Sequence, residues 1–147
     1  MFAIDTNLLI YAHNEDSESH RDACEFLECV MNQRDASGAF DVCLPAQVIT
    51  EFINVMTRQT MRSSLSLPQA ISVMQDYLDA GIPILFQKET QVTTFLNLLK
   101  SVKTRKKVFD VALAASLKDN GISGFYTVNV SDFEEFTFLD VRNPLEK

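Results

Sequence analysis

Residues 2–12 read FAIDTNLLIYA, which places a polar Asp-Thr-Asn triplet between two apolar runs. The first run, Phe2 to Ile4, is short and is bounded by an acid, as expected for a buried strand. The second run, Leu8 to Ala12, is typical of the opening of a helix. A buried strand followed at once by a helix favours an α/β unit, with Asp5 at the carboxyl end of its strand.

The remaining sequence continues this alternation of strands and helices. Further strands are predicted at 40–44, 83–86, 124–127 and 136–141. Helices are predicted at 19–32, 47–57, 66–79, 90–102 and 108–120. We therefore expect a three-layer α/β/α sandwich with a mostly parallel central sheet. In such sheets functional groups gather beyond the carboxyl ends of the strands.

Length and composition indicate one ordinary globular domain spanning residues 1–147. The chain is 46% hydrophobic and 22% charged, and it has neither an internal repeat nor a low-complexity tract. No apolar run approaches the ~20 residues that cross a bilayer, and an acid at position 5 is unlike a signal peptide. Three cysteines without a CxxC spacing fit a reducing compartment. We expect a cytoplasmic protein without a membrane segment.

Four acidic residues occupy positions where a charge is costly or unusual: Asp5, Glu51, Asp110 and Asp132. Each has an ordinary structural explanation, as a helix cap, a partner of a helix dipole, a residue on a wet helix face or a turn residue. Three of them, however, lie at a strand end or on a helix that follows one, so the fold would bring them to one edge. Converging carboxylates repel one another unless a cation neutralises them. Without nearby His or Cys that cation is Mg²⁺ or Mn²⁺, which commonly serves phosphoryl chemistry.

The ordered set of these residues resembles the PIN-domain family, and within it the VapC-type toxin ribonucleases of bacterial toxin–antitoxin systems. The resemblance covers essentially the whole chain. It consists of Asp5-Thr6-Asn7 after an N-terminal strand, Glu51 isolated in a helix, Asp110 before an Ala-rich helix, and Thr127, Asn129, Asp132-Phe133 and Asn143-Pro144 near the end.

The resemblance implies a Mg²⁺-dependent endoribonuclease in which Mn²⁺ would substitute. Its catalytic and metal-binding residues would be Asp5, Glu51, Asp110 and Asp132. Thr6, Asn7, Thr127 and Asn129 would be polar supports that orient the carboxylates or hold the water. It also implies an RNA substrate, a small antitoxin protein as partner, and a homodimer formed through the early helices, to which the apolar Leu9, Ile10 and Tyr11 would contribute.

The fourth acid departs from one version of the family pattern. Many members carry Asp two residues after the last strand's Thr, where this chain has Asn129. We assign the fourth role to Asp132, although the amide oxygen of Asn129 could also coordinate an ion. This substitution leaves an alternative function open, that of a catalytically inactive PIN-fold module that binds RNA or protein.

A basic stretch precedes the third acid. The chain has a net charge of −7, so it lacks the overall charge of a nucleic-acid-binding protein. The stretch nevertheless ends three residues before Asp110, and it could instead be a solvated helix end. We expect a local positive rim that holds the RNA backbone, formed by Lys103, Arg105, Lys106 and Lys107.

Overall fold

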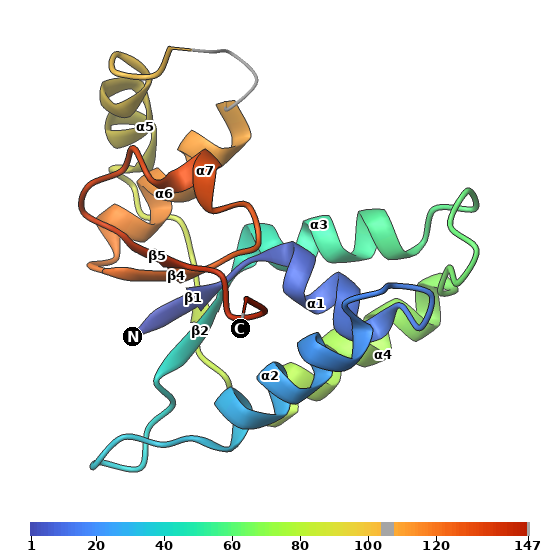
Figure 1. Cartoon of the computed structure of the whole chain (residues 1–147). Coiled ribbons are helices and arrows are strands. Elements are labelled where there is room, and N and C mark those ends of the chain that lie inside the picture. Colours follow the sequence, from blue (N-terminus) through green and yellow to red (C-terminus); the bar gives the residue numbers. More distant parts are fainter. Residues whose placement is uncertain (104–107, 147) are drawn as a thin grey trace.

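The computed structural model describes residues 1–103 and 108–146 and is built around a central sheet (Figure 1). Five strands are arranged in the order β3-β2-β1-β4-β5, and each described pair of neighbours is parallel. The strands are β1 (Phe2–Ile4), β2 (Val42–Pro45), β3 (Ile84–Leu85), β4 (Gly124–Tyr126) and β5 (Asp140–Arg142). This confirms the predicted sandwich with a parallel sheet.

Helices cover both faces of the sheet (Figure 1), and those within the described residues divide into four on one side and three on the other. The first layer contains α1 (Thr6–His13), α2 (His20–Asn32), α3 (Ala46–Met56) and α4 (Leu67–Asp79). The second layer contains α5 (Gln91–Leu99), α6 (Val108–Asp119) and α7 (Val130–Phe133). As predicted from its apolar sequence, α6 is buried along most of its length.

The two hydrophobic cores follow the alternation of side chains along the strands. Ile4 of β1 packs with α1–α4, whereas the adjacent Ala3 packs with the opposite layer, together with Cys43 and Phe125. The register pairs Ala3 with both Cys43 and Phe125, so the three side chains share one face of the sheet. This fixed register also sets where each strand ends, and the site lies at those ends.

The C-terminal part of the chain differs from the prediction in two respects, one strand boundary and one additional helix. The last strand was expected from Phe136 but begins at Asp140. Phe136 is instead buried beside Phe133 in the second core, and consecutive turns carry the backbone from Phe133 to Leu139. The short helix α7 was not predicted, because four residues are too few to show a helical period.

The expected contribution of the first helix to a dimer was also wrong. Leu9 and Ile10 are buried in the protein's own first core, where they pack with α2, α3 and the sheet. Tyr11 is half-buried against the same core. Leu9 and Ile10 are therefore used inside the subunit and are not available to a second copy, whereas part of Tyr11 stays exposed.

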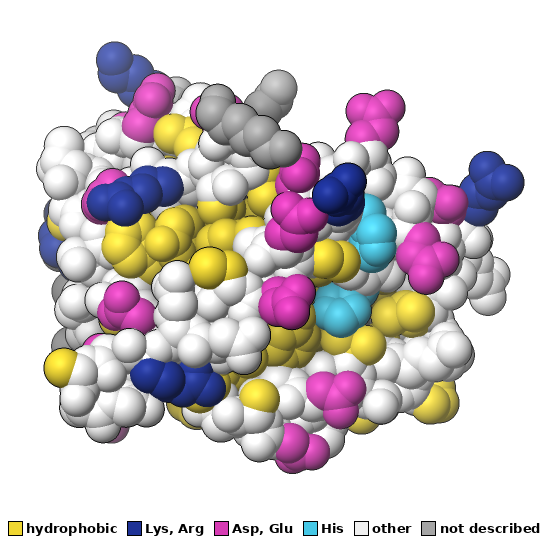
Figure 2. Space-filling model, turned by 60° about the horizontal axis from the view of Figure 1, so that its bottom comes forward, with side chains coloured by type: hydrophobic (Ala, Val, Ile, Leu, Met, Phe, Trp, Pro, Cys, Tyr) yellow, Lys and Arg dark blue, Asp and Glu magenta, His cyan; other side chains and the backbone are white. Residues whose placement is uncertain are grey.

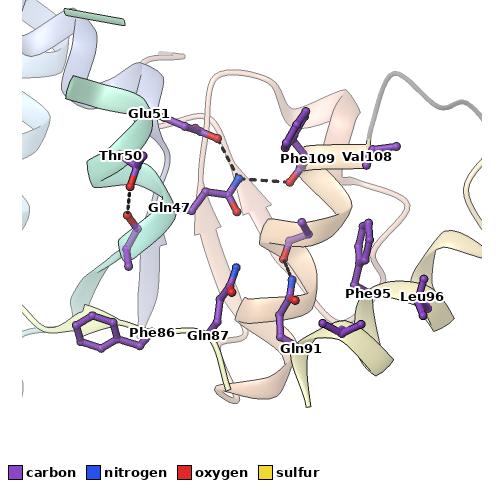
Figure 3. Close-up of a pocket in the computed structure, with 13 residues that line it drawn as sticks. Gln47, Thr50, Glu51, Phe86, Gln87, Gln91, Phe95, Leu96, Val108 and Phe109 are labelled. Carbon is purple, nitrogen blue, oxygen red and sulfur yellow. Dashed lines mark hydrogen bonds between the residues drawn. The ribbon is translucent and has the colours of Figure 1, made fainter. Parts of the chain in front are cut away.

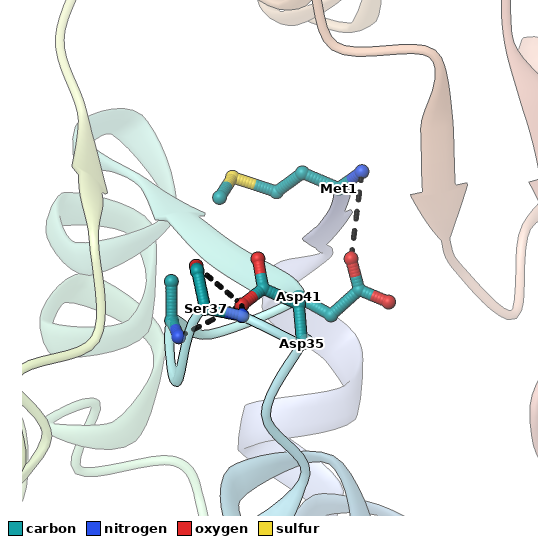
Figure 4. A network of polar contacts seen from close by, with 5 residues as sticks. Met1, Asp35, Ser37 and Asp41 are labelled. Carbon is teal, nitrogen blue, oxygen red and sulfur yellow. Dashed lines mark hydrogen bonds and ion pairs between the residues drawn. The ribbon is translucent and has the colours of Figure 1, made fainter.

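The edges of the fold are held by polar contacts. Before β2, Asp35 accepts hydrogen bonds from Ser37 and from the Ala39 backbone, and the Met1 amino group lies 3.7 Å from Asp41 (Figure 4).

Over the face in Figure 2, acidic and basic side chains are interspersed around gathered hydrophobic ones. Within the described residues, no helix is long and apolar enough to cross a membrane.

Candidate active site

The strand ends surround a cavity of about 280 Å³, which we call the carboxylate cavity. Three acids line it, and each comes from a different element: Asp5 follows β1, Glu51 lies on α3, and Asp110 lies in the first turn of α6. The other lining residues are Thr6, Asn7, Ile10, Asn54, Val55, Arg58, Asn129 and Phe133. Residues separated by more than a hundred positions in sequence thus meet at one edge of the sheet.

Asp5 is buried in the cavity and is held by two hydrogen bonds. It is 7% exposed and caps α1, since its Oδ1 accepts from the Thr6 backbone N–H at 2.8 Å. Its Oδ2 accepts from the Thr127 hydroxyl at 2.6 Å. Burial raises the pKa of the Asp5 carboxyl above its usual value, and the charges of Glu51 and Asp132 raise it further, although the two hydrogen bonds oppose this shift.

Two residues orient Glu51, and each donates a hydrogen bond to one oxygen of its carboxylate. The Thr6 hydroxyl donates to Glu51 Oε2 at 2.6 Å, and the Gln47 amide donates to Oε1 at 2.9 Å. Thr6 therefore touches two acids at once, through its backbone N–H to Asp5 and its hydroxyl to Glu51. These contacts hold both carboxylates in fixed orientations at the cavity.

The structure separates the two candidates for the fourth group. Asn129 lines the carboxylate cavity, as does the expected support Asn7. Asp132 lies one helical turn further on, in α7, and is not among the described lining residues. It is still close enough for its charge to raise the pKa of Asp5. Asp132 is thus near enough to affect the pKa of Asp5, whereas Asn129 lies on the cavity wall.

The expected basic rim lies mostly outside the described residues. Arg105, Lys106 and Lys107 belong to the segment 104–107, which the structure does not describe. Lys103 is exposed after the end of α5 and is not among the described residues that line the carboxylate cavity. Their contact with RNA stays a prediction.

The chemistry of the donor set fits a hard divalent cation. The cavity offers carboxylate and amide oxygens without His or Cys, and the crowded charges around Asp5 favour a neutralising ion. Among the described residues, no three His, Cys, Asp or Glu side chains converge tightly enough to hold a metal directly. Mg²⁺ keeps several of its waters when it binds to proteins, and a cavity of about 280 Å³ has room for them.

A larger, mainly apolar cavity of about 1000 Å³ adjoins the site on the other side of Glu51 (Figure 3). It lies between α3, α5, the start of α6 and the segment after β3. Glu51 lines both cavities, and Gln47 lines the larger one, where its amide reaches Glu51 and, at 3.4 Å, the backbone oxygen of Phe109. Around it, Phe86, Val92, Leu96 and Phe109 are between 54% and 77% exposed.

Sequence reasoning missed three polar residues around Glu51. Gln47 and Asn54 lie four residues before it and three after it, which are neighbouring positions on a helix surface. Arg58 lies seven residues after Glu51, just past the end of α3. This i−4, i+3, i+7 spacing was visible in the sequence, but it marks a functional face only when Glu51 is known to point into a cavity.

Known proteins similar in sequence cover the whole chain. Ribonuclease VapC24 of Mycobacterium tuberculosis is 30% identical over 148 residues, which cover 99% of this chain and 97% of the relative. Ribonuclease VapC43 of the same species is 33% identical over 149 residues, with the same coverage of both chains. No protein-family model matches the chain.

Solved structures agree with these relatives on the fold. The chain superposes on Mycobacterium tuberculosis VapC20, a toxin described as cleaving the sarcin–ricin loop, with a TM-score of 0.68 and 16% identity, over 97% of this chain and 100% of that one. It superposes equally well on FitAB bound to a DNA fragment, with 17% identity over 100% and 97% of the two chains. With a sequence relative at 30% identity over nearly its full length, the chain belongs to the VapC family of ribonucleases.

Proposed function

We propose that this chain is a metal-dependent endoribonuclease that cleaves RNA phosphodiester bonds and is the toxin of a toxin–antitoxin pair. The observation that carries this proposal is the meeting of Asp5, Glu51 and Asp110 in one cavity from three separate elements. Membership of the VapC family supports RNA as the substrate, because the full-length relatives are ribonucleases.

Mg²⁺ would be held by these three carboxylates in part through its own bound waters, with Asn129 in the same cavity and the charge of Asp132 nearby. When bound, such an ion supplies Lewis-acid stabilisation of phosphate charge and lowers the pKa of a water. The chain's own contribution is orientation. Thr6 and Gln47 hold the two oxygens of Glu51, and Thr127 holds Asp5, so the carboxylates need little rearrangement when the substrate arrives.

A protein antitoxin is proposed as the partner. One chain of a toxin–antitoxin complex from Klebsiella pneumoniae has the same fold as this chain, with a TM-score of 0.66 over the full length of both. An enzyme that cuts cellular RNA harms its host when it is free, which is consistent with a partner that restrains it.

The proposal is tested with purified protein and a single-stranded RNA of defined sequence. We expect internal cuts with Mg²⁺ or Mn²⁺, loss of cutting with EDTA, and loss in the Asp110→Asn variant. Cutting that persists in EDTA would contradict the metal dependence. RNA binding without cutting under every metal condition would instead favour the inactive binding module.

A further inference from the structure

Arg58 brings a positive charge into the carboxylate cavity. Glu51, Asn54 and Arg58 all line this cavity, so it extends along one face of α3 and past its last turn. The backbone around Arg58 is held in a turn, since its N–H donates to the Val55 oxygen at 3.2 Å and its own oxygen accepts from Met61 N–H at 3.1 Å. The side chain therefore starts from a defined position at the far end of the cavity.

The guanidinium of Arg58 has no protein partner among the described residues. Three other described arginines are engaged: Arg21 pairs with Glu25, Arg142 pairs with Asp140, and Arg34 donates to backbone oxygens while it covers the Phe40 ring. Arg62 is exposed and also lacks a partner within the described residues, but it does not line the cavity. Arg58 forms no ion pair or side-chain hydrogen bond within the described part of the chain, although it shares a cavity with three acids. Its five N–H donors are available to a ligand.

The charge of the cavity indicates what that ligand is. Three carboxyl groups against one guanidinium give the cavity a formal charge of −2 when all are ionised, which one divalent cation would cancel. If Arg58 were absent, the cavity would stay negative even with the ion present. A phosphodiester, itself an anion, would then meet a repulsive site. The guanidinium fork also matches the two free oxygens of a phosphate.

We propose that Arg58 binds a backbone phosphate of the RNA substrate and so sets the position of the strand in the site. This inference rests on the proposed ribonuclease function. Five residues of α3 follow Glu51 before the helix ends at Met56, which is about 8 Å along the helix axis, and Arg58 lies beyond that end. The phosphate bound by Arg58 is therefore a neighbour of the one that is cut, and Arg58 is a substrate-positioning residue.

The test measures which phosphate of the RNA depends on Arg58. A fluorescent ten-nucleotide single-stranded RNA is bound to the Asp5→Asn chain, in which cutting is blocked, and to the same chain with Arg58→Met. Each phosphate is replaced in turn by an uncharged methylphosphonate. Arg62→Met is the matched control, because Arg62 is also exposed after α3 but does not line the cavity. Arg58→Lys keeps the charge and removes the fork, and it serves if Arg58→Met lowers the melting temperature.

We expect Arg58→Met to weaken binding of unmodified RNA about tenfold and Arg62→Met to leave it unchanged. At one position of the RNA, a methylphosphonate should weaken binding about tenfold to the protein that keeps Arg58. The same methylphosphonate should not further weaken binding to the Arg58→Met variant. Equal penalties at every phosphate in both proteins would overturn the inference. Cleavage of the same RNA by the unaltered chain with Mg²⁺ is measured in parallel. If the RNA is cut but no single methylphosphonate penalty depends on Arg58, only the proposed role of Arg58 is refuted. If one penalty depends on Arg58 but the RNA is not cut, only the proposed ribonuclease function is refuted.

Discussion

The Thr127 hydroxyl donates a hydrogen bond of 2.6 Å to Asp5, a residue 122 positions earlier in the chain. Both residues follow adjacent parallel strands, β1 and β4, and Thr127 is completely buried. Thr127 also accepts a hydrogen bond from the Asn129 backbone N–H at 3.0 Å, so the same hydroxyl ties Asp5 to the loop that leads into α7. The strand pairing of the sheet thus determines the orientation of one carboxylate of the site.

Replacing Asp5 with Asn should separate catalysis from stability. We expect Asp5→Asn to lower RNA cleavage at least about a hundredfold while the melting temperature without metal stays equal to or above that of the unaltered chain. Asn keeps one oxygen, which can still accept from the Thr6 backbone N–H as a helix cap. Its NH2 group replaces the oxygen that accepts from Thr127 and can donate to the Thr127 hydroxyl instead, and the substitution removes a buried charge. Thermal unfolding in EDTA checks this. A large fall in melting temperature would show that the charge of Asp5 is needed for folding.

The same variant has a predicted pH dependence. Because the pKa of Asp5 is raised in the folded state, the folded protein binds more protons than the unfolded one above the ordinary carboxyl pKa. The stabilisation from Asp5 is therefore complete below about pH 4 and is lost as the pH rises through its raised pKa. We expect the melting temperature of the unaltered chain, relative to Asp5→Asn, to fall in EDTA as the pH rises above the ordinary carboxyl pKa of about 4. A constant difference would contradict the raised pKa.

Thr6→Val tests the orientation of Glu51. The substitution removes the 2.6 Å hydrogen bond to Glu51 Oε2 but leaves the backbone N–H that binds Asp5. We expect the Mg²⁺ concentration for half-maximal cleavage to rise about ten- to a hundredfold, the usual effect of losing a residue that orients a ligand. Thr50→Val is the control, because Thr50 lies on the same helix and bonds only to the Ala46 backbone oxygen. An equal rise in the Mg²⁺ requirement of both variants would show that the lost hydrogen bond from Thr6 to Glu51 is not its cause.

The meeting of Asp5, Glu51 and Asp110 could be anticipated from the sequence because it follows from strand ends. A parallel sheet brings the carboxyl ends of its strands to one edge, so an acid after a buried strand is placed there before any contact is known. Glu51 and Asp110 lie on helices that begin at that edge, and one or two helical turns keep them near it.

The parts that were missed depend on packing between elements. Leu9 and Ile10 appeared surplus to a small core, but α1 is covered by α2 and α3, which bury both residues. Arg58 enters the site through the turn that follows α3, which is placed by Met56 packing in the core and by the hydrogen bond from Arg58 N–H to the Val55 oxygen. The last strand begins later than Phe136 because Phe136 packs in the second core, where Phe133 contacts both Phe125 and Phe136.

We expect a homodimer that forms through the rim of the apolar cavity and not through α1. Phe86, Val92, Leu96 and Phe109 are large apolar side chains that are more than half exposed around one hollow, which is typical of an interface. Leu96→Glu should shift the chain to monomer in sedimentation at micromolar concentration. Ile71→Glu is the control, since Ile71 is 51% exposed on α4, in the layer opposite α5. A monomer in the unaltered chain would contradict the dimer.

The basic stretch predicts a salt-dependent effect on binding. Neutralising Lys106 and Lys107 together should flatten the dependence of log affinity on log salt by about 0.7 per lost phosphate contact. Cleavage at saturating RNA should change little, since these residues are expected to bind the backbone and not the reacting group. Arg21→Gln, on α2, is the control. An unchanged salt slope would mean that the stretch is solvated in the complex, and lost turnover with normal binding would mean that it reaches the cut phosphate.

The fourth group of the site is tested by adding and removing charge. Asn129 lines the carboxylate cavity without a charge, whereas Asp132 lies outside the described lining but raises the pKa of Asp5. We expect Asp132→Asn to increase the Mg²⁺ concentration for half-maximal cleavage about tenfold, because a nearby negative charge that attracts the ion is lost.

Asn129→Asp should act in the opposite direction and lower that Mg²⁺ concentration, because it places a fourth carboxylate on the cavity wall. When it is added to the Asp132→Asn variant, Asn129→Asp should restore the lost affinity for Mg²⁺. The double variant separates the two contributions, since a purely structural role of Asp132 would not be rescued by a charge introduced three residues away. If Asn129→Asp weakens metal binding and Asp132→Asn leaves it unchanged, the metal site does not extend to this end of the cavity. Titration of Mn²⁺ binding by electron paramagnetic resonance measures these affinities without relying on cleavage.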